Sequence, residues 1–118
     1  MTRTLLTAIF LTLFSQTASA ETVFYCTETV SLNVNNHELT NYKPQNFKFR
    51  ITERVVTFGS GGYFDNATKI ITSYSNENNW ASTDKYSMMW FNKGYFIFTS
   101  AFILTKQSAI ITAKCDKF

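Results

Sequence analysis

The chain contains few residues of the kinds that carry enzyme chemistry. It has one histidine and two cysteines, whereas a zinc site needs three or four His, Cys or acidic ligands. A nucleophile activated by histidine would depend on His37 alone, and no serine stands in a G-x-S-x-G sequence. We therefore expect no catalytic residue, no metal site and no cofactor.

Charge is also scarce. Only 16% of the residues are charged, the formal net charge is +3, and the basic residues are scattered along the chain. Nucleic-acid-binding domains usually carry a clustered basic surface. This balance therefore excludes nucleic acid from the expected partners, and it does not by itself indicate an anionic membrane.

Glycine and proline are rare, with four glycines and one proline. No repeat, linker or low-complexity tract is present, which indicates a single domain. The one glycine cluster is Gly59-Ser60-Gly61-Gly62. A phosphate loop needs a helix and a Gly-Lys-Ser or Gly-Lys-Thr sequence after its glycines, and neither follows here. The cluster instead predicts a turn or bulge in which glycine accepts the backbone angles.

Residues 1–20 have the three parts of a secretory signal peptide. Arg3 gives a positive start, Leu5–Phe14 is an apolar run, and Ala18-Ser19-Ala20 matches an A-x-A cleavage site. The apolar run is too short to cross a bilayer, which needs about 20 residues. We predict a signal peptide at 1–20 and a single exported β domain at 21–118, periplasmic or secreted, that does not span the membrane once the signal peptide is removed.

The two cysteines, Cys26 and Cys115, stand near the two ends of the predicted mature domain. Two cysteines in a small exported domain predict a disulfide. The bond would close a loop that spans almost the whole domain, for which the chain-entropy model gives about 4–5 kcal/mol. It would also place the first and last strands close together, because bonded cysteines have Cα atoms about 5.5 Å apart.

Alternation of apolar and polar residues dominates the mature chain, and no segment has a convincing helical period. About eight strands with frequent turns predict an all-β fold, a small antiparallel barrel or sandwich whose first and last strands are joined by the disulfide. The expected strands are Thr22–Val34, Phe47–Thr52, Val55–Phe58, Thr68–Tyr74, Trp80–Thr83, Tyr86–Phe91, Tyr95–Leu104 and Ala109–Cys115.

Three local features of this pattern can be checked against a structure. We expect residues 35–46 to form a polar loop. We expect Asn92-Lys93-Gly94 to be a three-residue hairpin loop with Gly94 in the left-handed conformation. The first strand is predicted to have one apolar face that Glu28 interrupts, and the apolar residues of that face are Phe24, Cys26, Val30, Leu32 and Val34.

Aromatic residues are abundant, at 17% of the chain. Between Met88 and Leu104 both alternating faces are apolar, whereas a strand with one wet face should alternate. Either the aromatics fill a small core and this hairpin is covered on both sides, or part of it is an exposed patch that binds a partner. The candidate aromatic surface consists of Trp80, Trp90, Tyr95 and Phe96.

Carboxylates are the remaining source of catalytic chemistry. Glycoside cleavage uses a pair of them, but no pair stands out among Glu28, Glu53, Asp65, Glu77 and Asp84. Glu28 is unusual because it interrupts an apolar face. A buried carboxylate can have a shifted pKa and a function, or it can lie beside a bulge or pair with a lysine or arginine. We expect the protein not to be an enzyme, with a small hydrolase as an alternative.

Three short segments carry a resemblance to a known family. They are Phe24-Tyr25-Cys26, Cys115 and Ser60-Gly61-Gly62-Tyr63, and together they resemble the periplasmic inhibitors of C-type lysozyme. Those inhibitors are small exported β-barrels with a cysteine near each end. Their inhibitory loop has a Ser-Gly followed shortly by Tyr, which matches Ser60, Gly61 and Tyr63, while their second inhibitory motif has no clear counterpart here. The resemblance implies a candidate binding loop made of Gly59, Ser60, Gly61, Gly62 and Tyr63.

The sequence therefore favours a non-enzymatic binding module of the cell envelope, whose partner would be a protein, a glycan or a lipid. The alternatives are an inhibitor of a lytic enzyme such as lysozyme and a small hydrolase. Each predicts a different geometry. A binding module needs an exposed aromatic patch, an inhibitor needs Ser60 and Tyr63 exposed on a protruding loop, and a hydrolase needs two carboxyl groups about 5–10 Å apart in a cleft.

Overall fold

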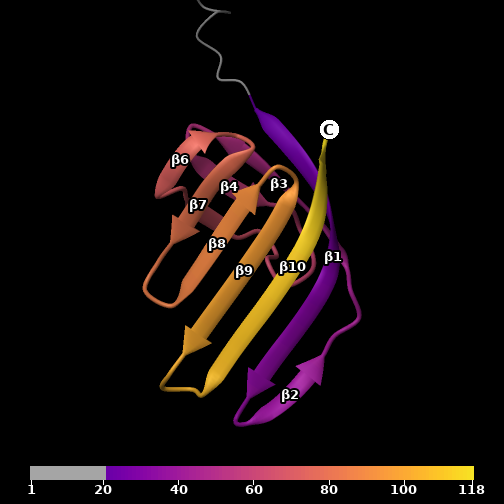
Figure 1. Ribbon diagram of the computed structural model, residues 1–118, viewed down its shortest axis with the longest axis vertical. Helices are drawn as coiled ribbons and strands as arrows, with labels where there is room; N and C mark the ends of the chain where they lie inside the picture. Colours follow the sequence, from indigo (N-terminus) through magenta and orange to yellow (C-terminus); the bar gives the residue numbers. More distant parts are fainter. Residues whose placement is uncertain (1–20) are drawn as a thin grey trace, which may run out of the picture.

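The computed structural model describes residues 21–118, and the predicted signal peptide lies outside them. All the regular structure in this range is β-strand, which confirms the predicted fold class (Figure 1). The strands are β1 (Thr22–Asn35), β2 (Glu38–Asn41), β3 (Asn46–Thr52), β4 (Val55–Phe58), β5 (Thr68–Ile70), β6 (Ser73–Asn76), β7 (Asn79–Thr83), β8 (Ser87–Asn92), β9 (Tyr95–Phe102) and β10 (Gln107–Lys117).

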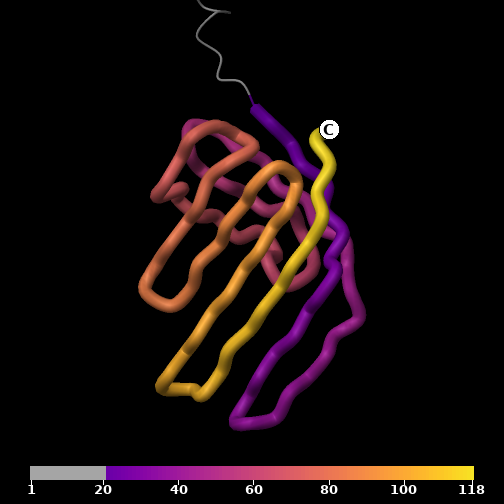
Figure 2. The backbone as a smooth tube through the Cα atoms, in the orientation of Figure 1, coloured from indigo at the N-terminus to yellow at the C-terminus, as the bar shows by residue number. Residues whose placement is uncertain are grey.

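The strands form one antiparallel sheet in the order β5-β4-β3-β1-β10-β9-β8-β7-β6, and β2 pairs with the second half of β1. The sheet curls into a half-barrel, which the backbone trace shows with β3 and β4 passing behind β8 and β9 (Figure 2). The first and last strands pair directly, as expected. They lie at the centre of the sheet, however, and its two edges are β5 and β6.

The two edges of the sheet meet at the short connection between β5 and β6. The Ile71 N–H donates to the Arg54 carbonyl at 2.9 Å, and the Thr72 N–H donates to the Ala81 carbonyl at 2.9 Å. The Ser82 hydroxyl donates to the carbonyl of Ile70 at 2.7 Å. These bonds tie β5 to the β6–β7 hairpin, so one end of the half-barrel is nearly closed although β5 and β6 do not pair.

Three predicted elements are corrected by the structure. Residues 35–46 are not a plain loop, because Asn36 and His37 adopt positive φ and turn the chain into β2. The expected strand Thr68–Tyr74 is two strands, broken where the sheet edges meet. The loop after β8 has two residues, since Asn92 pairs with Tyr95, although Gly94 has the expected positive φ of 86°.

A β-bulge in the middle of β1 changes which side chains face the interior. Glu28 pairs with Ala113 and Val30 pairs with Thr112, which leaves Thr29 as the extra residue. One inserted residue reverses the facing of all that follow. Phe24 and Cys26 are therefore buried in the core, whereas the next three apolar residues of the strand, Val30, Leu32 and Val34, point outward. The prediction of one continuous apolar face on this strand is wrong.

The core lies inside the curl and is mainly aromatic. Phe49 contacts the rings of Phe24 at 5.2 Å and Phe91 at 5.4 Å, and Trp80 stacks on Phe91 at 5.6 Å. Edge-to-face and offset pairs at these distances add about 0.5–1.5 kcal/mol each to the burial of the rings. The prediction that the aromatic residues fill a small core is therefore confirmed for this group.

The predicted disulfide is present between Cys26 of β1 and Cys115 of β10. The two residues face each other in the ladder with Cα atoms 4.0 Å apart, and they are separated by 89 residues in sequence. The covalent bond thus reinforces the central strand pair of the sheet. In the chain-entropy model, a cross-link between residues so far apart in sequence lowers the entropy of the unfolded chain and thereby stabilises the fold by about 4–5 kcal/mol.

Candidate binding surfaces

The convex side of the sheet carries an apolar surface made by residues at facing positions on neighbouring strands. Because paired residues of an antiparallel sheet lie on the same side, the ladder register defines three rows across β8, β9, β10, β1 and β2. The rows are Trp90, Ile97, Thr112, Val30; Met88, Thr99, Ile110, Leu32, Asn41; and Ala101, Ser108, Val34, Leu39. We call these residues, with Tyr95 two residues before Ile97, the outer face.

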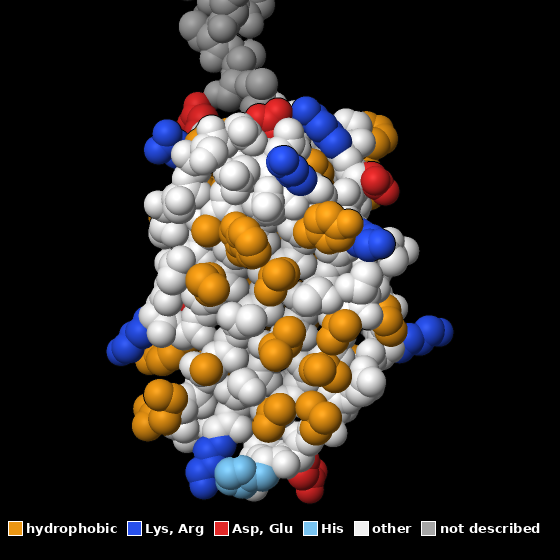
Figure 3. All heavy atoms as spheres, viewed as in Figure 1, with side chains coloured by type: hydrophobic (Ala, Val, Ile, Leu, Met, Phe, Trp, Pro, Cys, Tyr) orange, Lys and Arg blue, Asp and Glu red, His pale blue; other side chains and the backbone are white. Residues whose placement is uncertain are grey.

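None of the outer-face residues is charged, and the charged residue beside them on this side is Lys114 of β10, which pairs with Tyr95 in the ladder. Figure 3 looks onto this face and shows hydrophobic side chains interspersed with uncharged polar ones, while Lys, Arg, Asp and Glu lie mostly at the margins. Trp90 is 45% exposed and Tyr95 is 60% exposed. The exposed apolar patch that the sequence offered as an alternative is therefore present on this side of the hairpin.

The structure divides the four predicted surface aromatics into two pairs. Trp90 and Tyr95 lie on the outer face, whereas Trp80 and Phe96 are in the core with exposed fractions of 2% and 0%. The prediction is wrong for Trp80 and Phe96 because they occupy the inward positions of β7 and β9. Between Met88 and Phe98, alternate side chains point into the core and toward solvent. This alternation puts Phe96 in the core and leaves Trp90 and Tyr95 exposed.

Sequence reasoning missed the contribution of β1 and β2 to the outer face. Val30, Leu32 and Val34 were expected on one apolar face with Phe24 and Cys26, and Leu39 was expected in a polar loop. The bulge at Thr29 turns the first three outward, and its side chain supports this, because Thr29 Oγ1 lies 2.6 Å from Thr112 Oγ1 on the outer face. The one signal in the sequence was Glu28, a charged residue that interrupts the apolar face of the predicted strand.

The candidate binding loop connects β4 to β5 and is anchored on the core. Phe64 is buried and stacks on Phe58 at 4.6 Å, and the Asn66 N–H donates to the Gly59 carbonyl at 3.0 Å. Ser60 is exposed, and Tyr63 is half exposed with its ring 5.4 Å from that of Phe98. The loop therefore presents both residues to solvent, while its other aromatic residue fixes it against the sheet.

Tyr63 also separates two hollows on the inner side of the sheet. One, of about 360 Å³, is lined by Glu28, Ser31, Asn33, Tyr42 and Gln45, and the other, of about 430 Å³, is lined by residues that include Tyr86, Phe98 and Phe102. The Ser100 hydroxyl, between Phe98 and Phe102 in β9, is buried and has no hydrogen-bond partner within residues 21–118. These hollows are shallow and mixed in polarity.

The carboxylates with assigned contacts have structural partners. Glu28 is buried beside the bulge, and its Oε1 accepts a hydrogen bond from the Gln45 N–H at 2.9 Å. Of the interpretations that the sequence offered for Glu28, this is the position beside a bulge. The ammonium of Lys117 contacts the Glu77 carboxylate at 3.3 Å. The pKa of the Glu77 carboxyl is lowered mainly by a backbone hydrogen bond and, to a smaller extent, by Lys117.

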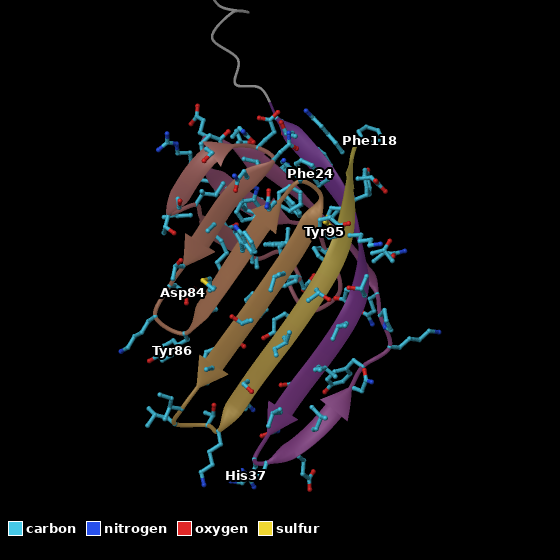
Figure 4. The ribbon with its side chains drawn as sticks, in the orientation of Figure 1. Phe24, His37, Asp84, Tyr86, Tyr95 and Phe118 are labelled. Carbon is cyan, nitrogen blue, oxygen red and sulfur yellow. A yellow bond between two sulfur atoms is a disulfide. The ribbon has the colours of Figure 1, made fainter. Side chains whose placement is uncertain are left out.

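Asp84 organises the turn between β7 and β8, where Figure 4 labels it beside Tyr86. Its carboxylate accepts hydrogen bonds from Lys69 Nζ at 2.7 Å, from the Tyr86 N–H at 2.9 Å and from the Ser87 N–H at 2.8 Å. The Lys69 ammonium, and then the Tyr86 N–H, hold the pKa of the Asp84 carboxyl well below its ordinary value. The Lys69–Asp84 ion pair also links edge strand β5 to the turn between β7 and β8.

Residues 21–118 contain no group of three or more His, Cys, Asp or Glu side chains that could hold a metal ion. Within the same range no helix is long and apolar enough to cross a membrane. Comparison of the chain with protein-family models, curated proteins and solved structures found no significant match. The resemblance to lysozyme inhibitors therefore stays a prediction, and function has to be argued from the surfaces themselves.

Proposed function

We propose that this chain is an exported, disulfide-bonded binding module of the cell envelope that binds another protein through its outer face. The observation that carries the proposal is the uncharged outer face, on which Trp90 and Tyr95 are exposed beside Met88 and Ile97. The centres of protein interfaces are depleted in charge and enriched in Trp, Tyr and Met. Trp and Tyr are also the residues on which binding energy most often depends.

The composition of the outer face favours a protein over a glycan as its partner. Glycan sites combine an aromatic platform with several directed hydrogen-bonding side chains, whereas the polar residues among the apolar ones here, such as Thr99, Thr112 and Ser108, have short side chains. Thr29 and Thr112 already contact each other. Aliphatic neighbours such as Ile110 and Leu32 extend the apolar area across the sheet, which suits the side chains of a folded protein.

Export is supported by two independent features. The predicted signal peptide at 1–20 has its parts in the order that secretion requires. The Cys26–Cys115 disulfide is of a kind that persists in oxidising compartments outside the cytosol. An exported domain of this size with an uncharged apolar face needs a partner in the compartment where it resides.

Affinity capture with paired variants tests the proposal. The wild-type domain is immobilised and exposed to envelope extract, alongside the variant Trp90→Ser/Tyr95→Ser and a control, Tyr42→Ser/Ile70→Ser. The control removes an exposed aromatic and an exposed aliphatic residue that lie outside the outer face. We expect wild type and control to retain the same protein, and the outer-face variant to retain it at least about tenfold more weakly, because loss of interface hot spots costs 2 kcal/mol or more.

Equal retention by the outer-face variant would contradict the proposal, provided that circular dichroism shows it folded. In the same experiment, a Ser60→Ala/Tyr63→Ala variant distinguishes binding through the outer face from the alternative that the chain inhibits a lytic enzyme through its candidate binding loop. If the captured protein is a lytic enzyme, and if only this loop variant loses it, the candidate binding loop is the functional site and the outer face is not.

A further inference from the structure

The turn between β9 and β10 places large aliphatic side chains fully in water. Ile103 is 85% exposed and Leu104 is 96% exposed, at a turn completed by Thr105 and Lys106. Tight turns are normally built from Gly, Asn, Asp, Ser and Pro, whose backbone preferences suit them. Lys106 here supplies the positive φ, at 56°. Two adjacent exposed aliphatics at such a position have no role in the fold.

Aromatic and basic side chains surround this turn in a definite order. The ring of Phe102, at the end of β9, stacks on that of Tyr86 from the β7–β8 turn at 5.3 Å. Lys85 Nζ lies 5.3 Å from the centre of the Tyr86 ring. Moving from the tip toward the sheet, one therefore meets aliphatic side chains, then stacked rings, with a lysine beside the rings.

The charges near the turn are mainly positive. Lys106 belongs to the turn itself and Lys85 lies beside the Tyr86 ring, while Asp84 is occupied by Lys69 and by the backbone of its own turn. One acidic residue, Glu38, begins β2 directly after the adjacent β1–β2 turn. The net charge of the chain did not indicate an anionic surface as a partner, but the position of these two lysines does.

The turn also lies at a free end of the molecule. Figure 1 shows it at the bottom of the sheet, opposite the C-terminus and the start of β1. Figure 4 shows the neighbouring β1–β2 turn, marked by His37, at the same end. The Asn36 N–H donates to the Lys106 carbonyl at 3.0 Å, so the two turns support each other. Nothing in residues 21–118 covers Ile103 and Leu104.

We propose that Tyr86, Phe102, Ile103, Leu104, Lys85 and Lys106 form a membrane-docking tip that inserts into an anionic lipid surface. Ile103 and Leu104 enter the acyl boundary, the two rings lie at headgroup depth as interfacial aromatics do, and the lysines meet the lipid phosphates. Burial of each aliphatic side chain and the approach of each lysine to an anionic leaflet both favour binding. The tip does not include the outer face, so docking would leave that face free for a protein.

Sedimentation with lipid vesicles tests the membrane-docking tip. The oxidised domain is mixed with vesicles of phosphatidylcholine and phosphatidylglycerol, and separately with vesicles of phosphatidylcholine alone. We expect sedimentation with the anionic vesicles that weakens as salt is added. The variant Ile103→Ser/Leu104→Ser should bind at least about tenfold more weakly, whereas the control Tyr42→Ser/Ile70→Ser, which removes two exposed apolar side chains outside both the tip and the outer face, should bind as the wild type does.

Two further variants make the outcome specific. Lys85→Ala/Lys106→Ala should lose most of the preference for anionic vesicles. Trp90→Ser/Tyr95→Ser should keep vesicle binding even if it loses its protein partner, so failure of one proposal is distinguishable from failure of the other. The inference is overturned if wild-type protein does not sediment with anionic vesicles, if the Ile103→Ser/Leu104→Ser variant binds as well as wild type, or if the lysine variant keeps the anionic preference.

Discussion

At the scale of single residues, this glycine-poor chain makes many of its tight turns with residues that rarely adopt positive φ. Turns of the mirror-image type fit the twist of a hairpin but need left-handed residues at both central positions. The chain meets this need with polar and charged side chains at a cost of roughly 1–2 kcal/mol each. The non-glycine residues with positive φ are Asn36, His37, Glu53, Arg54, Asn66, Lys93 and Lys106.

Gly94 is the turn residue that no other residue can replace cheaply. Its φ is +86°, and a Cβ there would lie 3.0 Å from the carbonyl oxygen of Cys115. Gly61 has a similar φ of +88°, but nothing lies within 4 Å of its added Cβ. We expect Gly94→Ala to lower the free energy of unfolding by about 1 kcal/mol more than Gly61→Ala, because only the first adds a clash to the backbone strain. Urea denaturation measures both, and equal losses would contradict the steric argument.

At the scale of elements, the sequence predicts the strands well where polar and apolar residues alternate without interruption. The pattern at Phe47–Thr52 needs only local rules, and the structure places β3 there. The bulge at Thr29 and the break at Ile71-Thr72 could not be predicted, because each is set by pairing with a distant strand. Because the bulge was missed, Val30, Leu32 and Val34 were predicted on the same side of their strand as Phe24 and Cys26 rather than on the outer face.

The turn between β7 and β8 gives the protein a pH-dependent element. The pKa of Asp84 is lowered in the folded state, and an unfolded aspartate has a pKa of about 3.9. Its contribution to stability is therefore fully present well above about pH 4 and is lost as the pH falls through the folded value. Because the Asp84–Lys69 pair is 46% and 32% exposed, we expect Asp84→Asn to cost only about 1 kcal/mol near neutral pH.

Denaturation of the wild type and Asp84→Asn at neutral and acidic pH measures this contribution. The stability gap between the two proteins should shrink as the pH falls below about 4. Lys69→Met serves as the companion variant: it should reproduce part of the loss at neutral pH, since it removes the ion pair and leaves the turn hydrogen bonds. A gap that stays constant across this pH range would contradict the assignment.

At the scale of the whole molecule, the half-barrel divides its aromatic residues between two tasks. The inner side holds a packed aromatic core next to the Cys26–Cys115 disulfide, and the convex side exposes the uncharged outer face. The candidate site was predictable only in part. Alternation identified Trp90 and Tyr95, but curvature and register decide which apolar residues join them, and both depend on long-range pairing that local sequence does not encode.

The central claim, that the outer face binds a protein, is tested most directly by crosslinking inside the producing cell. A photoreactive phenylalanine analogue is placed at Trp90 in one strain and at Ile70, on exposed edge strand β5, in another. We predict a discrete adduct with one envelope protein at Trp90 and none at Ile70, because only the former lies within the outer face. Absence of any adduct at Trp90, or the same adduct at both positions, would contradict the claim.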